Sequence, residues 1–468
     1  MTSVERKELQ SPNCSNVSKI LGKFIKNSHT LSLAGNITNA ILGFGSLALV
    51  ARLLSKDDMG AWFMFLTAYI FADLLRAGII HTSLVRFAAS SEKEQFGEVA
   101  GSGWLISIIT TLILSIVTIL ADIFFSHLIT NEGFRLFLSW YWLAALTTLP
   151  FNYAAWLLQA RSSFEKVIYI RLLNQLSFLT CILIALITQT SSVEIVLAGF
   201  IFSGLLPSAI SLWTGWSMIG TVRLATKKMM KDLFNFGKFS MGTMMGSNLL
   251  RSSDTLIIGF MLSARALASY SISLKLIEVI EILLRSFAVS AMPIMSKFRT
   301  PDKKLELRAI FYKYTGLLSF VLLPFIIGSI LFADSLVVLL GGAQYAESAH
   351  VLRILAVYTA FLPLDRFSGI TLDIIGKPYL NFIKVILMLI VNVTGDIIAI
   401  HYFGTIGSIA AVSILTFLTG VIFGNYFLKK YLNHSIKETL STGFNTLMDM
   451  ARSVKDRFKL MRIGNSAS

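Results

Sequence analysis

The chain has 468 residues, of which 55% are hydrophobic and 14% are charged, and its mean hydropathy is +0.71. A soluble protein of this length would expose far more charge, so the composition excludes a soluble globular fold. Apolar runs of roughly 20 residues recur, whereas a transmembrane β-barrel would alternate polar and apolar residues. The sequence therefore predicts an all-α polytopic membrane protein.

The chain opens with a polar segment that lacks the apolar core of a signal peptide. Ile20 and Phe24 recur at helical spacing among lysines, so residues 1–29 are expected to form a cytoplasmic amphipathic tail. A basic amphipathic cytoplasmic tail is likewise expected over residues 429–468. Either tail could lie on the cytoplasmic leaflet, and a partly ordered tail is the alternative for both.

Between these tails the hydropathy pattern predicts about twelve transmembrane spans, each long enough to cross a hydrocarbon core of about 30 Å. The predicted spans are 30–53, 59–81, 102–123, 136–159, 167–188, 194–218, 239–262, 267–293, 310–333, 348–372, 379–400 and 406–428.

Lysine and arginine gather in the tails and in every second connection, and the longest basic connection is the linker 219–238. The intervening connections carry almost none, with Lys56 and Arg265 as the exceptions. Because basic loops stay on the cytoplasmic side, both termini are expected to be cytoplasmic. The net charge of +15 is then a topology signal. No nucleic-acid partner is expected, since the chain has no basic soluble domain.

An internal repeat relates the two halves of the chain. A shift of 208 residues places ARLLSKDDMGAWF (51–63) over GFMLSARALASYS (259–271) and brings Asp73 onto Glu281. The simplest architecture is two six-helix bundles, 30–218 and 239–428, joined by the cytoplasmic linker 219–238. Since six is even, both bundles share one orientation, and a pseudo-twofold axis along the membrane normal relates them.

Ionisable and amide side chains form polar stripes inside several predicted spans. Such groups are costly in a bilayer and are expected to face the protein interior or a hydrated cavity. They could equally be pairs that only lock the bundles together. Their number and their presence in both halves favour a central cavity. The residues expected to line it are Asn36 and Asn39 in the first span, Asp73 and Arg76 in the second, Asn248, Arg251 and Asp254 in the seventh, and Lys275, Glu278, Glu281 and Arg285 in the eighth.

Three segments resemble the polysaccharide flippases of the multidrug/oligosaccharidyl-lipid/polysaccharide exporter superfamily. The first is VARLLSKDDMGAWFMFLTAYIFADLLRAGIIHTSLVRF (50–87), which is similar to the N-terminal signature of that family. The others are RSSDTLIIGFMLSARALASYSISLK (251–275) and LDIIGKPYLNFIKVILMLIVN (372–392). In the second segment Ala268 and Ser269 replace a glycine that is usual in the family.

The resemblance implies a plasma-membrane flippase that moves an isoprenoid phosphate- or diphosphate-linked oligosaccharide from the cytoplasmic to the outer leaflet by alternating access. It implies lipid-linked oligosaccharide as substrate and membrane lipids as surroundings. A polysaccharide polymerase or another glycan-assembly protein is a candidate partner. On this hypothesis the basic and amide residues (Arg76, Arg251, Lys275, Arg285, Asn36, Asn39 and Asn248) bind substrate. The acidic residues (Asp73, Asp254, Glu278 and Glu281) serve gating or coupling.

Four alternatives stay open at this point. A peptidoglycan-precursor flippase usually has extra spans, for which this chain has no room, and a scaffold protein without transport activity would leave the polar stripes unexplained. A multidrug or cation antiporter of the same superfamily would favour acidic, aromatic cavities, and the intramembrane arginines argue against it. A membrane glycosyltransferase or ligase would need larger outer loops than the connections here provide. Cys14 and Cys181 are far apart and the histidines are scattered, so no metal site, cofactor or catalytic residue is expected.

Overall fold

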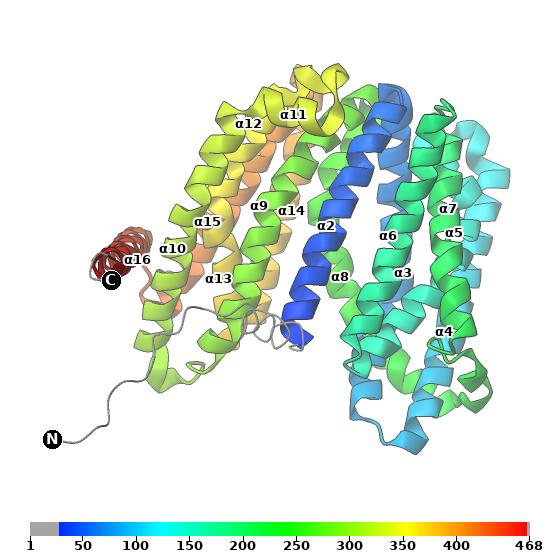
Figure 1. Cartoon of the computed structure of the whole chain (residues 1–468), viewed down its shortest axis with the longest axis horizontal. Coiled ribbons are helices and arrows are strands. Elements are labelled where there is room, and N and C mark those ends of the chain that lie inside the picture. The colour runs from blue at the N-terminus through cyan, green and yellow to red at the C-terminus, as the bar shows by residue number, and fades with distance from the viewer. Residues whose placement is uncertain (1–27, 466–468) are drawn as a thin grey trace. The chain divides into compact units, whose positions relative to one another are not determined.

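The computed structural model describes residues 28–465, which form helices joined by turns. The predicted N-terminal tail lies outside the described residues apart from Ser28 and His29. All twelve predicted spans are helical within the described range (Figure 1). The helices are α2 (Ser28–Leu53), α3 (Lys56–Ser90), α4 (Lys93–Phe125), α5 (Glu132–Ala160), α6 (Phe164–Ile187), α7 (Val193–Trp213), α8 (Lys227–Met261), α9 (Ala264–Ser296), α10 (Lys304–Leu331), α12 (Ala349–Tyr358) with α13 (Leu362–Ile374), α14 (Pro378–Phe403) and α15 (Ile406–Leu432).

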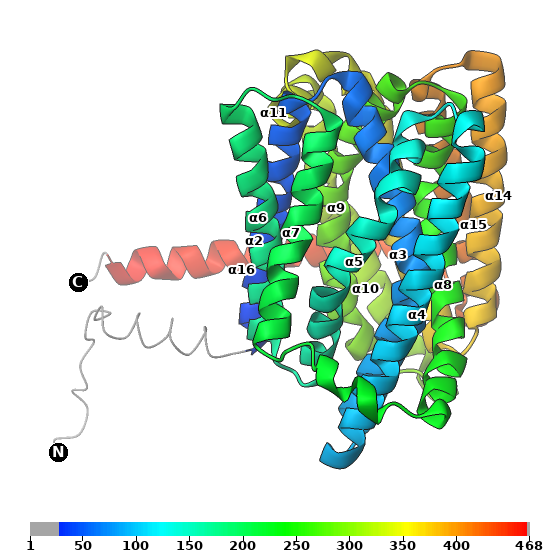
Figure 2. The same ribbon diagram turned by 90° about the vertical axis from the view of Figure 1, so that its right-hand side faces the viewer.

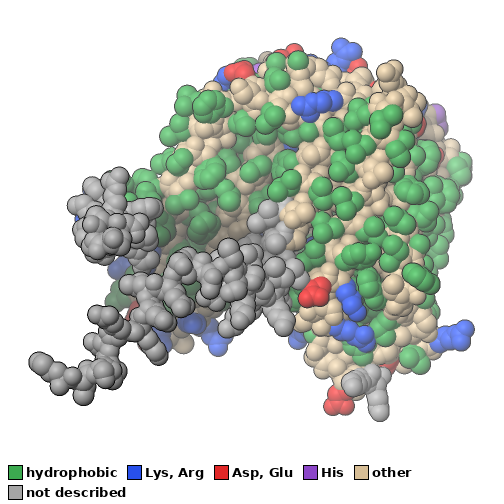
Figure 3. Space-filling view, viewed as in Figure 1, with side chains coloured by type: hydrophobic (Ala, Val, Ile, Leu, Met, Phe, Trp, Pro, Cys, Tyr) green, Lys and Arg blue, Asp and Glu red, His purple; other side chains and the backbone are tan. Residues whose placement is uncertain are grey.

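Seven of the described helices are long and apolar enough to cross a membrane by length and composition alone. Helices α8 and α9, which hold the predicted polar stripes, are not among them. In Figure 3, hydrophobic side chains are spread over the surface on view, and the charged side chains lie mainly toward its upper and lower edges. This distribution is typical of a multi-pass membrane protein.

The tenth span differs from the prediction because it is not one straight helix. Helix α12 ends at Tyr358, a 3-10 turn covers Thr359–Phe361, and α13 follows with Pro363 in its first turn. Proline has no backbone N–H and clashes with the preceding turn, so it favours a new helix start at this point. The helix of the sixth predicted span, α7, also stops at Trp213 instead of the predicted 218, shortly before Gly215, which has a φ of +69°.

The repeat is visible in how two helices begin. Helix α3 starts directly after Ser55, whose hydroxyl accepts a hydrogen bond from the Asp58 N–H. Helix α9 starts directly after Ser263, whose hydroxyl accepts one from the Ala266 N–H. These serines are equivalent under the shift of 208 residues. Each satisfies a backbone donor that the first helical turn leaves free, so the same local signal starts the same helix in both halves.

Contacts divide the chain into two compact units. Unit 1 comprises the described residues up to Leu53, then Ala72–Ser126 and Leu138–Gly242. Its core is built around Trp104 and Tyr153, whose ring centroids lie 4.3 Å apart. The Trp104 Nε1–H donates to the carbonyl of Ser217 and the Tyr153 hydroxyl to that of Ala100, each at 2.6 Å. The polar ends of both buried aromatic residues are thereby satisfied.

Unit 2 comprises Leu54–Phe71, His127–Phe137 and the described residues from Thr243 onward. It includes the C-terminal helix α16 (Ile436–Asn465), which runs across α10 (Figures 1 and 2). The two helices cross at Gly316 and Gly443, where a Cβ on Gly443 would stand 2.1 Å from the Gly316 carbonyl carbon. Leu440, Phe444 and Met448 of α16 are exposed along one side. That side is the apolar face expected of the C-terminal tail.

His434, in the turn between α15 and α16, makes this junction sensitive to pH. Its ring is buried and lies 4.9 Å from that of Phe311 and 5.6 Å from that of Tyr312. Burial lowers the pKa of the His434 imidazole to about 4. The unfolded chain, with a histidine pKa of about 6.5, therefore binds a proton that the folded junction does not. The stabilisation is full above about pH 6.5 and decreases as the pH falls toward 4.

We therefore expect limited proteolysis of the purified protein to release α16 faster at pH 5 than at pH 7.5. His434→Phe keeps an aromatic ring without a titrating group, so it should flatten this pH dependence. His127→Asn, at an exposed turn, should leave it unchanged. Equal pH dependence in wild type and His434→Phe would contradict the assignment to His434.

Candidate functional site

Unit 2 contains a cavity of about 360 Å³ lined by α8, α9, α12, α13, α14 and α15. Helical periodicity explains why the charged residues of α8 and α9 share it. On α8 the lining residues Ser247, Arg251 and Asp254 recur every three or four positions, as neighbours on one face do. The charged side chains around the cavity are Arg251, Asp254, Glu278, Glu281, Arg285, Asp365 and Arg366.

Arg251 is the centre of an ion-pair network within this cavity. Its Nη2 lies 3.0 Å from Glu278 Oε1 and 3.7 Å from Glu281 Oε2. The Lys275 ammonium lies 3.1 Å from Glu278 Oε1. The Arg285 Nε–H points to the Glu281 backbone carbonyl at 3.4 Å. The cations and carboxylates predicted from α8 and α9 therefore compensate one another near the middle of both helices.

Asp254 lies deeper in the same unit, in a polar cluster that joins four helices. Its carboxylate accepts hydrogen bonds from the Tyr270 hydroxyl, from Asn392 Nδ2 at 2.9 Å and from Ser413 Oγ at 3.1 Å. Asp396, one turn after Asn392 on α14, is fully buried and interacts electrostatically with Asp254. No described residue donates a hydrogen bond to either Asp396 carboxylate oxygen.

Two buried carboxyl groups this close cannot both stay charged without a proton or a cation between them. The oxygen groups around the pair are two carboxylates and the hydroxyls of Ser413 and Tyr270. The Asn392 amide turns its nitrogen toward Asp254, and its oxygen accepts a hydrogen bond from Ser253. Such a set suits a proton or a small hard cation. The described residues include no cluster of three or more His, Cys, Asp or Glu side chains able to hold a metal ion.

Two residues of this site were missed in the sequence: Lys384 and Asp396, both on α14. The Lys384 ammonium is 3% exposed and lies 2.7 Å from Asp365 Oδ1. It also donates to the Asp365 carbonyl at 2.9 Å. The signal was available, because these two are the only Lys, Arg, Asp or Glu residues in the otherwise apolar predicted span 379–400.

Asp73 and Arg76 belong to unit 1, where they tie α3 to α5. Arg76 is fully buried; it pairs with Asp73 and donates to the Ala145 carbonyl at 2.9 Å. Its contact with Thr148 Oγ1, at 3.5 Å, is longer. The structure thus gives Arg76 a packing role between two helices and leaves little of its charge accessible.

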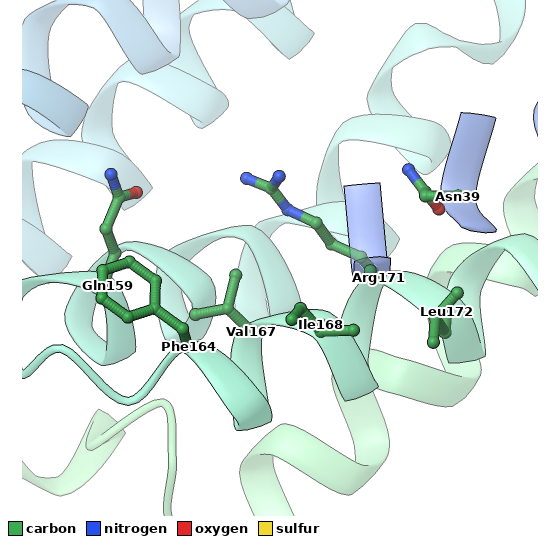
Figure 4. A pocket seen from close by; sticks show the side chains of 8 residues that line it. Asn39, Gln159, Phe164, Val167, Ile168, Arg171 and Leu172 are labelled. Atoms are coloured by element: carbon green, nitrogen blue, oxygen red, sulfur yellow. The ribbon is translucent and has the colours of Figure 1, made fainter. Parts of the chain in front are cut away.

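The three predicted asparagines fall in different places. Asn248 lines the unit 2 cavity and donates to the Met244 carbonyl at 2.9 Å. The side chain of Asn36 lies outside the described residues. Asn39 lines a separate cavity of about 190 Å³ in unit 1, together with Gln159 and Arg171 (Figure 4). Arg171, on α6, was not singled out in the sequence.

At one end of unit 2, segment 54–71 packs against the start of α9 and the turn before α12. Arg265 Nη2 lies 2.8 Å from Asp57 Oδ2, and Lys56 pairs with Glu347. The Gln344 side chain donates to the Leu54 carbonyl at 3.3 Å. Lys56 and Arg265, the two exceptions to the predicted charge alternation, are therefore each neutralised by a carboxylate. We call this set the Ser55-end contacts.

The fold and the charged cavity together define a multi-pass helical membrane transporter. Residues 49–350 match the family described as "Polysaccharide biosynthesis protein". The chain therefore belongs to the polysaccharide biosynthesis protein family. The family resemblance predicted from the sequence is confirmed.

Two curated relatives align with part of the chain. The "Probable low-salt glycan biosynthesis flippase Agl15" of Haloferax volcanii is 21% identical over 234 residues, which are 50% of this chain and 49% of that protein. The "Teichuronic acid biosynthesis protein TuaB" of Bacillus subtilis is 25% identical over 154 residues, 33% of this chain and 32% of that protein. The alignments thus span about half and about a third of these relatives.

Solved structures share the fold. One of lipid II flippase MurJ, in an inward closed conformation, has a TM-score of 0.66 at 16% identity and covers 89% of this chain and 91% of its own. An inward-facing multidrug resistance MATE family transporter of the MOP superfamily has a TM-score of 0.71 at 16% identity and covers 85% and 96%. These similarities confirm the predicted all-α transporter fold.

Proposed function

We propose that this protein flips a lipid-linked oligosaccharide from the cytoplasmic to the outer leaflet for polysaccharide synthesis, by alternating access. Its family and the name of the Haloferax relative, a probable glycan biosynthesis flippase, support the substrate class. In this proposal both termini are cytoplasmic, and the Ser55-end contacts lie at the outer side. The domain division is the one expected from the sequence, with bundles 30–218 and 239–428.

The observation that carries the proposal is the charge-compensated cavity around Arg251. A lipid-linked glycan brings an anionic phosphate and many hydroxyls, while its isoprenoid tail can stay in the bilayer. Arginine binds such oxyanions with paired hydrogen bonds. In the absence of substrate, Glu278 and Glu281 hold the Arg251 charge. A head group that replaces these carboxylates as partner of Arg251 frees them to accept hydrogen bonds from sugar hydroxyls.

The Asp254–Asp396 pair supports a coupling role for an ion. Loading or releasing a proton or a small cation changes the charge of a buried cluster that joins α8, α9, α14 and α15. That change biases how these helices pack. Asp73, by contrast, is already paired with Arg76.

The test uses cells whose own copy of the protein is deleted and which express the Arg251→Gln variant in its place. A membrane-impermeant glycan-modifying reagent reports the leaflet of the lipid-linked oligosaccharide. Loss of a charge-assisted contact worth about 1.5–3 kcal/mol should lower outer-leaflet glycan by roughly 10- to 100-fold. Arg353→Gln is the matched control, because Arg353 pairs with Asp334 on an exposed surface away from the cavity.

Normal export by Arg251→Gln would contradict the role of this cavity. Unchanged glycans in cells without the protein, together with altered sensitivity to cationic drugs, would instead support the antiporter alternative.

A further inference from the structure

Arg171, inside the predicted span 167–188, has no carboxylate partner among the described residues. Arg76, Arg251 and Lys384 each pair with an Asp or Glu. Arg171 has no ion pair and no hydrogen bond to any described residue, and its side chain is exposed to the unit 1 cavity. An uncompensated arginine within a spanning helix is costly unless water or an anion meets it. Its charge is therefore available to a ligand.

The described residues that line this cavity include neutral polar groups and no acid, and the Gln159 amide oxygen lies 3.3 Å from the His81 ring nitrogen Nε2. In Figure 4 the Arg171 guanidinium projects between the amide groups of Gln159 and Asn39. The Oδ1 atom of Asn39 is buried and has no hydrogen-bond partner. Oxygen and nitrogen of an amide can exchange places, so Asn39 has an unused polar group at this cavity under either assignment. The cavity, at about 190 Å³, has room for more than one water, which takes about 30 Å³.

The same cavity has an apolar wall. Phe164, Val167, Ile168 and Leu172 of α6 line it beside the polar groups. Arg171 lies about 10 Å along the helix axis from Phe164, at 1.5 Å per residue. With the start of α6 at the cytoplasmic side, as in the proposed orientation, Arg171 lies just inside the cytoplasmic end of the predicted span 167–188. A cation and two amides facing an apolar wall suit an amphiphile with an anionic head.

We infer that the unit 1 cavity is a binding site for the phosphate group of an isoprenoid-linked lipid, with Arg171 as its cation and Gln159 and Asn39 as hydrogen-bond partners. This inference rests on the proposed function and adds a head-group site on a different unit from the Arg251 cavity. An anion at Arg251 must first displace Glu278 and Glu281, whereas an anion at Arg171 displaces no described carboxylate, so the two sites can act at different stages of transport.

The experiment is isothermal titration calorimetry on the purified full chain in detergent without phospholipid, using farnesyl diphosphate, farnesol and inorganic pyrophosphate as probes. We expect wild type to bind farnesyl diphosphate more tightly than either other probe. Arg171→Gln should weaken farnesyl diphosphate binding at least tenfold. Arg171→Lys should retain it within about threefold, because the charge remains.

The control is Arg161→Gln. Arg161 is another unit 1 arginine, at the end of α5, and its guanidinium lies over the Phe96 ring, outside the cavity. The affinity of Arg161→Gln for farnesyl diphosphate should equal that of wild type. Gln159→Glu is a second variant that keeps Arg171 and should weaken diphosphate binding about tenfold by repulsion. If the melting temperature of Gln159→Glu equals that of wild type, its weaker binding reflects repulsion of the ligand and not misfolding.

Equal affinity of wild type and Arg171→Gln would overturn the inference. Pyrophosphate binding as tight as that of farnesyl diphosphate would assign the cavity to a soluble phosphate and overturn the lipid assignment. The leaflet assay distinguishes failure of the proposed function from failure of this binding site. Farnesyl diphosphate binding that depends on Arg171, with unchanged glycans in cells without the protein, would contradict the flippase and leave the site in place.

Discussion

Asp396→Asn is expected to abolish export while leaving the purified protein as stable as wild type or more so. Asp396 is fully buried beside Asp254, and no described donor reaches its carboxylate. Removing one of two adjacent buried charges relieves repulsion and desolvation, and replacing buried ionic groups is often neutral or stabilising by about 1–4 kcal/mol. The neutral amide also fixes the cluster in one charge state, so an ion-coupled cycle stops.

Asp254→Asn is the informative comparison. Asp254 accepts hydrogen bonds from Tyr270, Asn392 and Ser413, and an amide cannot accept all of them without leaving a partner unsatisfied. We therefore expect Asp254→Asn to lower the melting temperature as well as export, at a cost of about 1–3 kcal/mol. Asp334→Asn, at an exposed ion pair, should change neither.

The measurements are thermal unfolding in detergent and the leaflet assay in cells. Wild-type export by Asp396→Asn would show that Asp396 carries no coupling charge. A melting temperature of Asp396→Asn well below that of Asp254→Asn would contradict the expected relief of repulsion and desolvation.

Hydropathy and loop charge were sufficient to predict the helical spans. The span 379–400 lies within α14 (Pro378–Phe403), and 406–428 lies within α15 (Ile406–Leu432). The break at Thr359–Phe361 escaped prediction because the apolar run continues through it. Pro363 was the available signal, and proline is tolerated in many membrane helices, so its presence alone does not locate a break.

For the site, the periodicity of each helix predicted which residues share a face. The sequence did not predict which residues pair between helices. The spacing of Glu278 and Glu281 placed both on one face of α9, as the cavity lining shows. That Arg251 meets both, or that Lys384 meets Asp365, depends on which helices pack together. A single sequence carries the 3.6-residue period of each helix and no record of its neighbours. Arg171 lies inside the predicted span 167–188, and this position was the signal that would have identified it.

Gly60→Leu is expected to break the Ser55-end contacts and stop transport. A Cβ at Gly60 would lie 1.9 Å from the carbonyl oxygen of Ala264, the first residue of α9. Backbone cannot rotate away as a flexible side chain can, so the two segments must separate. Overpacking of this kind costs about 1–3 kcal/mol, which shifts a two-state equilibrium roughly tenfold or more away from the packed arrangement.

Crosslinking reports this shift directly. In a background with Cys14→Ser and Cys181→Ser, a short bifunctional thiol reagent should link Asp57→Cys to Arg265→Cys, whose native side chains pair at 2.8 Å. Adding Gly60→Leu should reduce the yield about tenfold and export in parallel. Gly328→Leu in α10 is the matched control, because a Cβ there meets nothing within 4 Å. Undiminished crosslinking with Gly60→Leu would mean that the Ser55-end contacts tolerate the added bulk. Lost crosslinking with normal export would mean that transport does not require these contacts to close.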